Sequence, residues 1–161
     1  MKSEVWIRWC LEHGADPHGR SYNGRIDVLT NAGQHASMQT LQLLVAYGAD
    51  IRRSNALHGA AEDRRVDRVD VIHWLLDEVG ILINQRRYED DDWWSDMETP
   101  LHRAVVGNSP HSARVLLQRG ADTSLRDYSG RPARDLALWL PEHDDVLEVW
   151  RIGSRIRRLV W

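Results

Sequence analysis

The chain has 161 residues, a formal net charge of −3, and 42% hydrophobic and 28% charged residues. These values are near those of globular domains, so they argue against a disordered chain, and the slightly acidic balance argues against a nucleic-acid partner. No apolar run approaches the roughly 18 to 20 residues that cross a bilayer, so we expect no membrane partner. Cys10 is the only cysteine, which rules out an internal disulfide and suits a protein of the cytoplasm or nucleus.

The chain starts with an apolar helical stretch, Val5 to Leu11, that is followed by the turn Gly14-Ala15-Asp16. The same turn recurs as Gly48-Ala49-Asp50 and as Gly120-Ala121-Asp122, each time after an apolar helix. Self-similarity at a fixed spacing of this kind predicts a solenoid of stacked repeats. The first repeat is then a half repeat, because only its second helix is present.

A pair of helices is predicted between the first two of these turns. VLTNAG, from Val28, is typical of a short first helix, and a run of leucines from Leu41 builds the second. Gly33 falls inside the first helix, where a glycine costs up to about 1 kcal/mol relative to alanine.

The next unit reads ALHGAAED from Ala56 and VDVIHWLLDEVG from Val69, again as two helices. The segment QRRYEDDDWWSDME that follows from Gln85 is longer than the corresponding turn after Asp122. We therefore expect an insertion there, which carries acids and two adjacent tryptophans.

The pattern is clearest in TPLHRAVVGNSPHSARVLLQRGAD, from Thr99 to Asp122. Thr99 is a good N-cap, Pro100 fits the first helical position, and Gly107 with Asn108 ends the helix. Ser109-Pro110 begins a second helix that stops before Gly120. The first helix has a face of small residues, so the hairpin must bury its faces against copies of itself.

The last unit begins DYSGRPARDLA at Asp127, with Asp135 in the position that His102 occupies in the preceding unit. A closing helix follows Pro141 and places Val146 and Val149 on one side. Its acids lie near the start and its arginines near the end, which is the arrangement that the helix dipole favours.

TPLHRAV followed by VLLQRGAD resembles the ankyrin repeat, and NALHGAAE and VLTNAG resemble weaker copies of its first helix. The resemblance implies an all-α ankyrin-repeat solenoid, a single domain over residues 1–161. Its expected units are the half repeat 1–21, repeats at about 22–53, 54–87 and 98–126, the insertion 88–97, and a C-terminal capping repeat 127–161. It also implies that His58 and His102 are structural, bonding within and between repeats.

The resemblance further implies a non-catalytic protein-interaction module that needs no cofactor and no metal. A protein or peptide partner is expected in a groove lined by the solvent-facing positions of the first helices, which are Asn31, Gln34, His35, Gly59, Glu62, Asp63, Arg103 and Val106. The inserted finger is expected at the rim of this groove, with candidate contacts Arg86, Arg87, Tyr88, Asp91, Asp92, Trp93 and Trp94. Exposed tryptophans often supply much of the energy at binding hot spots.

Other interpretations stay open. The acids from Glu89 to Asp92 fit a solvated charge run better than a calcium loop, since the turn glycine of such a loop is missing. One or both of Trp93 and Trp94 could anchor the finger rather than touch a partner. A hydrolase using the acids or Cys10 is a remote alternative, because no base is placed beside a nucleophile.

The start in mid-repeat has three interpretations: a fragment of a longer ankyrin-containing protein with its effector domain elsewhere, a misassigned start, or an apolar N-terminal face that mediates self-association.

Overall fold

The computed structural model describes residues 2–19, 27–63, 68–86, 98–140 and 144–158, and for residues 2, 3 and 152–158 only the backbone. The described residues form helices and connecting turns and contain no extended strand. The elements are α1 (Lys2–Glu12), α2 (Val28–His35), α3 (Met38–Ala46), η1 (Ile51–Arg53), α4 (Ala56–Glu62), α5 (Val69–Asp77), α6 (Pro100–Val106), α7 (Pro110–Gln118), α8 (Ala133–Trp139) and α9 (Asp144–Arg158).

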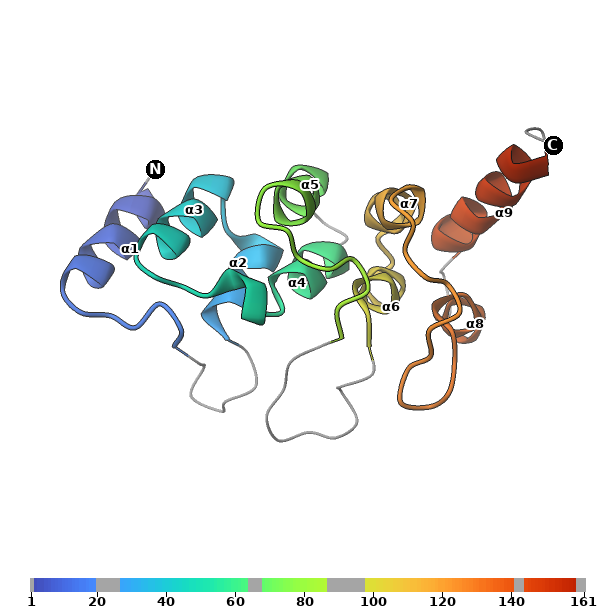
Figure 1. Cartoon of the computed structure of the whole chain (residues 1–161), viewed down its shortest axis with the longest axis horizontal. Coiled ribbons are helices and arrows are strands. Elements are labelled where there is room, and N and C mark those ends of the chain that lie inside the picture. The colour runs from blue at the N-terminus through green and yellow to red at the C-terminus, as the bar shows by residue number, and fades with distance from the viewer. Residues whose placement is uncertain (1, 20–26, 64–67, 87–97, 141–143, 159–161) are drawn as a thin grey trace.

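The helices lie in two layers, and successive hairpins stand side by side along the long axis (Figure 1). One layer, which we call the first-helix layer, holds α2, α4, α6 and α8, and each packs on the next. The other, the second-helix layer, holds α1, α3, α5, α7 and α9. The described segment that connects α7 to α8 projects beyond the first-helix layer (Figure 1), and we call this side the loop side of that layer. The predicted all-α solenoid is therefore confirmed.

Local sequence explains where the helices begin and end. Thr99 caps α6 in a capping box that it shares with His102, and Pro100 takes the first position of the helix. Gly107 is the C-cap of α6, and Asn108 after it has a φ of 49°. Asp27 caps α2 by accepting a hydrogen bond from the Thr30 amide at 2.6 Å. The cap-and-break signals predicted around Thr99 and Gly107 are confirmed.

The core is a continuous spine of leucines and alanines that runs from one repeat to the next. Leu57 and Leu101 occupy the same position in α4 and α6 and are 0% and 1% exposed. Ala60 and Ala104, one helical turn later, are both 0% exposed. Because alanine keeps the side-chain layer thin, neighbouring first helices can approach closely.

The helices α2 and α4 approach each other closely, and this contact depends on two glycines. A Cβ at Gly33 would lie less than 3.0 Å from the carbonyl of Ala56, and a Cβ at Gly59 equally close to the carbonyl of Thr30. Each glycine thus removes the one group that would hold the two backbones apart. The expectation that Gly59 faces the solvent is wrong, because it is buried in this contact.

Side chains also link the turns of neighbouring repeats. His18 Nε2 accepts a hydrogen bond from the Asp50 amide at 3.0 Å, and Asn84 Oδ1 accepts one from the Asp122 amide at 2.9 Å. At the equivalent place in the intervening repeat, Arg52 Nε donates to the Val79 carbonyl at 2.8 Å. A histidine, an arginine and an asparagine thus each link one turn to the backbone of the next, so the sequence does not show these links as a repeated residue.

The two ends of the stack differ. At the N-terminal end, Val5 and Trp6 of α1 are 70% and 62% exposed, and the rings of Trp6 and Trp9 stack with centroids 5.0 Å apart. The predicted apolar N-terminal face is therefore present, while self-association through it stays a prediction. At the other end α9 packs on α7 and α8 and buries Val146 and Val149, as expected of a closing helix.

Candidate functional site

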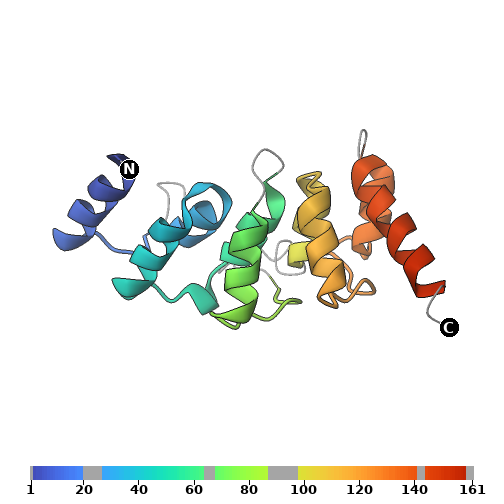
Figure 2. The ribbon, with the colours of Figure 1, turned by 90° about the horizontal axis from the view of Figure 1, so that it is seen from above.

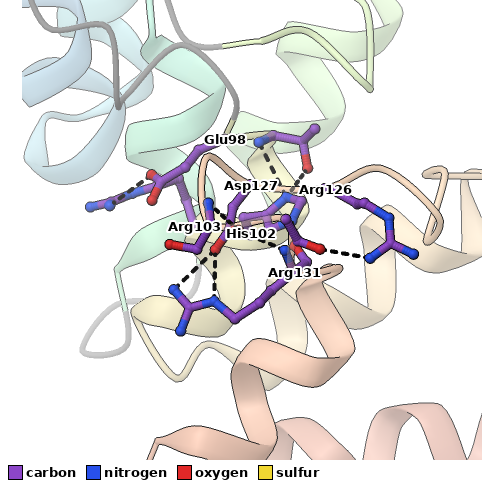
Figure 3. Close-up of polar contacts among 9 residues, drawn as sticks. Glu98, His102, Arg103, Arg126, Asp127 and Arg131 are labelled. Atoms are coloured by element: carbon purple, nitrogen blue, oxygen red, sulfur yellow. Dashed lines mark hydrogen bonds and ion pairs between the residues drawn. The ribbon is translucent and has the colours of Figure 1, made fainter.

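The loop side of the first-helix layer carries an ion-pair network built around Arg103 of α6 (Figure 3). Arg103 Nη2 contacts Glu62 Oε1 at the end of α4, and Arg103 Nη1 contacts Glu98 Oε2 at 3.1 Å. The three side chains are 17%, 27% and 14% exposed, in the order Arg103, Glu62, Glu98. One guanidinium thus joins two neighbouring repeats and presents a partly exposed, mixed-charge surface.

Arg103 keeps its charge in this network. Burial lowers the pKa of the guanidinium, but the hydrogen bond and charge of Glu62, together with Glu98, outweigh burial and raise the pKa above its usual value. The carboxylates also leave acceptor capacity at the surface, because each oxygen can accept more than one hydrogen bond.

Two buried histidines connect the helices to the loops beside this network. His58 Nε2 lies 3.2 Å from the carbonyl oxygen of Glu98, and His102 Nε2 lies 3.2 Å from that of Arg131. Each imidazole reaches from one repeat to the base of the loop that opens the next. The structural role predicted for both histidines is confirmed.

The protonation of His102 follows from its partners. The Thr99 amide donates to Nδ1 at 3.3 Å, and the Thr99 hydroxyl lies 2.8 Å from the same atom. Because an amide N–H can only donate, Nδ1 is the acceptor and the proton is on Nε2, where it is donated to Arg131. Burial lowers the pKa of His102, and the charge of Arg86 lowers it further. The hydrogen bond to the Arg131 carbonyl and the charges of Asp127 and Glu98 raise the pKa, but they do not outweigh burial.

We expect this histidine to make stability fall in mild acid. The pKa of His102 is lowered in the folded state, so the unfolded chain binds the proton more readily. The contribution of His102 to the free energy of unfolding is therefore fully present above the ordinary histidine pKa of about 6.5. The contribution is lost as the pH falls from there through the folded-state pKa. Urea unfolding across this range should give a shallower pH dependence for His102→Gln than for the parent chain. Equal slopes would contradict the assignment.

The loop before α8 is held in shape by the buried side chain of Asp127. The buried carboxylate of Asp127 accepts hydrogen bonds from the amides of Ser129 and Arg131 at 2.9 and 2.8 Å, and it pairs with Arg131 Nη2 at 3.2 Å. Arg86, two residues before the insertion 88–97, donates from Nη1 to the Arg126 carbonyl at 3.0 Å. The chain just before the insertion is therefore tied to the loop before α8.

Some of the residues predicted to bind a partner lie in the part of the chain that the structure describes, and the others lie outside it. Glu62 and Arg103 meet in the network, and Gln34 lies half-buried on α2. His35 Nδ1 is 3.4 Å from Asp63 Oδ2, but the Asp63 side chain is only 8% exposed, less than a solvent-facing position implies. Of the finger candidates only Arg86 is described. The others lie outside the described residues, namely Arg87, Tyr88, Asp91, Asp92, Trp93 and Trp94.

Sequence reasoning missed Glu98, Arg68 and Asp127 as organising residues. Arg68 is 6% exposed and donates from Nε and Nη2 to the carbonyls of Gly33 and Ala32 at 3.1 and 3.3 Å, which satisfies the end of α2. Burial lowers its pKa, while the charges of Asp70 and Asp63 oppose this. An arginine in a polar loop gives no periodic signal, so its burial was not predictable, whereas Asp127 sits at a recognisable turn position before Gly130.

A family model described as ankyrin repeats (3 copies) matches residues 29–127, which is more than half of the chain. The chain belongs to the ankyrin repeat family. Ankyrin repeats are a general protein–protein interaction module, and the family is generally non-catalytic.

Two curated proteins are similar to parts of this ankyrin repeat chain. NF-kappa-B inhibitor alpha of Sus scrofa is 48% identical over 40 residues, which are 25% of this chain and 13% of that protein. Zygote-specific protein 3 of Chlamydomonas reinhardtii is 38% identical over 52 residues, or 32% of this chain and 14% of that protein. The matched stretches thus span only a small part of either relative.

Two further observations concern only the described residues. Every helix among the described residues is too short or too polar to span a bilayer. Histidine, cysteine and carboxylate side chains do not come together there in groups of three or more that could hold a metal ion.

Proposed function

We propose that this ankyrin repeat chain is a non-catalytic adaptor that binds a protein or peptide partner on the loop side of its first-helix layer. The contact surface consists of the groove residues Gln34, His35, Glu62, Asp63 and Arg103 together with the inserted finger. Within the finger we assign contacts to Arg86, Arg87, Tyr88, Asp91, Asp92, Trp93 and Trp94. Alternating charges on this surface suit a polar, extended peptide segment or a folded protein.

The Glu62–Arg103–Glu98 network is the observation that supports this proposal most directly. It holds charged groups of both signs at the surface while fixing their positions through contacts between two repeats. Side chains that are already ordered lose little conformational entropy when a partner binds. The surface is therefore prepared for recognition before the partner arrives.

The finger adds specificity to this rigid surface. Arg86, the one described finger candidate, is held by its contact to the Arg126 carbonyl, and we expect a partner in the groove to touch Arg86. Acids in the finger favour a partner with basic groups, since complementary charges steer association and disfavour wrong partners.

A comparison of two chains tests the proposal. The intact chain and a chain in which residues 88–97 are replaced by a short glycine-serine linker are immobilised and used to capture partners from a cell extract of the source organism. The proposal expects a partner that the intact chain retains and the shortened chain loses, and competition with free intact chain should release it. Equal capture by both chains would contradict the role of the finger, and capture of nothing above a resin control would contradict the binding function.

The two tryptophans of the finger give a sharper prediction. We expect Trp93→Ala combined with Trp94→Ala to weaken binding of the captured partner by about 1 kcal/mol or more, with a nearly unchanged thermal midpoint of unfolding. Isothermal titration and a thermal melt measure the two quantities. Trp139→Ala is the matched control, because Trp139 is 76% exposed on α8, and it should leave both unchanged. A large fall in the midpoint of the double variant would show that the rings are structural.

A further inference from the structure

A pocket of about 400 Å³ opens between the second helices α3 and α5, away from the proposed groove. Figure 2 shows these two helices side by side, with η1 between their C-terminal ends. These helices approach each other less closely than α5 and α7 do, and the pocket lies in the space between them. Its walls are mostly apolar and include the half-buried ring of Trp74, with Val45, Ala49, Ile51 and Val79 around it.

Two exposed carboxylates stand at the pocket, those of Asp50 and Glu78. In the part of the chain that the structure describes, neither has an ion pair, whereas Asp77 next to Glu78 accepts a hydrogen bond from Arg119 at 2.7 Å. The pocket also lies at the C-terminal ends of α3 and α5, and neither helix has a basic residue in its last turn. The negative ends of two helix dipoles therefore add to the two carboxylates.

One positive group lines the same pocket. Arg52 is held to the wall by its Nε, which donates to the Val79 carbonyl at 2.8 Å. Its charge offsets one of the two carboxylates, so the lining keeps a net charge of about −1, to which the helix dipoles add. The pocket therefore combines an apolar floor, an indole ring and an excess of negative charge.

We propose that this pocket is a second binding site, which takes a basic side chain from an apolar segment of a polypeptide partner. A lysine or arginine has a long apolar stem that fits against Val45 and Val79, and a cation that the carboxylates attract. The indole of Trp74 favours the same cation through its ring face. A neutral side chain of equal length would fill the volume but leave the remaining negative charge of the lining uncompensated.

The site lies in the second-helix layer, so it is separate from the groove and does not depend on the proposed function. A partner that binds both layers would have to reach around the edge of the stack. A segment that binds only here leaves the finger and Arg103 free for another partner.

Short peptides test the proposal on the full chain. The chain is labelled with ¹⁵N, and the indole N–H signal of Trp74 is assigned by its absence in Trp74→Phe. Acetyl-Leu-Lys-Leu-amide, the same peptide with arginine, and versions with norleucine or glutamate at the centre are titrated at low salt. We expect the lysine and arginine peptides to shift the Trp74 signal and to bind about tenfold more tightly than the norleucine peptide, which corresponds to one charge-assisted contact of about 1.4 kcal/mol.

Two single-charge variants separate this site from general attraction to an acidic chain. Glu78→Gln should weaken binding of the lysine peptide severalfold, whereas Asp70→Asn, at the other end of α5, should not. Both residues are exposed, and a thermal melt checks that both variants fold. Equal binding of lysine and norleucine peptides, preference for glutamate, an unshifted Trp74 signal at saturating peptide, or equal effects of the two variants would each overturn the proposal.

Discussion

Gly59→Ala is expected to lower the free energy of unfolding by about 2 to 3 kcal/mol, although alanine is the better helix former. At an exposed helical position the same change raises stability by up to about 1 kcal/mol. Here the added Cβ would lie less than 3.0 Å from the backbone carbonyl of Thr30, and a backbone cannot swing aside as a flexible side chain can. The sign of the effect therefore distinguishes close packing from helix propensity.

Asn31→Ala provides the matched control for this experiment. Asn31 is exposed on α2, one residue after Thr30, so an alanine there improves helix propensity without touching α4. We expect it to be neutral or stabilising by a few tenths of a kcal/mol. Urea unfolding of both variants measures the difference. A Gly59→Ala chain as stable as the parent would mean that α2 and α4 are not in this contact.

His102→Leu is expected to cost about 3 kcal/mol, the second large effect. The leucine fills a similar volume but removes the acceptor for the Thr99 amide and the donor to the Arg131 carbonyl. Leaving buried polar groups without partners costs about 1 to 3 kcal/mol for each group. The loss should appear in urea unfolding at neutral pH, where the native histidine is uncharged.

Asp135 offers a control at the corresponding position of the last repeat. It occupies the histidine position of α8, but it is exposed. We expect Asp135→Ala to change stability by about 0.5 kcal/mol or less, as surface substitutions usually do. Similar losses for the two variants would show that the bridge from one repeat to the next is not the source of the effect of His102.

The features that were predictable from sequence are those set by residues close together in the chain and found again in several repeats. Thr99, Pro100 and Gly107 mark the ends of a helix by chemistry that acts within a few residues, and the small side chain of Ala104 on its inner face implies a close neighbour. The resemblance of both motifs to the ankyrin repeat then implied that His58 and His102 form bonds between repeats. All of these are found in the structure.

Contacts that join residues far apart in the chain were not predictable in the same way. Gly59 and Arg103 occupy equivalent helical positions, yet one is buried against Thr30 and the other spans the surface to Glu62. Which outcome occurs depends on the distance between neighbouring helices, which no single repeat encodes. The burial of Arg68 and the pocket beside Trp74 arise from the same kind of long-range spacing.

We propose above that a partner binds the loop side of the first-helix layer. A map of backbone amide chemical-shift changes in the ¹⁵N-labelled chain, recorded on adding the partner that the intact chain captures, tests it most directly. We expect the largest changes in α4, α6 and residues 86–98, with Glu62, Glu98 and Arg103 at their centre. Changes confined to the outer surfaces of α3, α5 and α7 would contradict it.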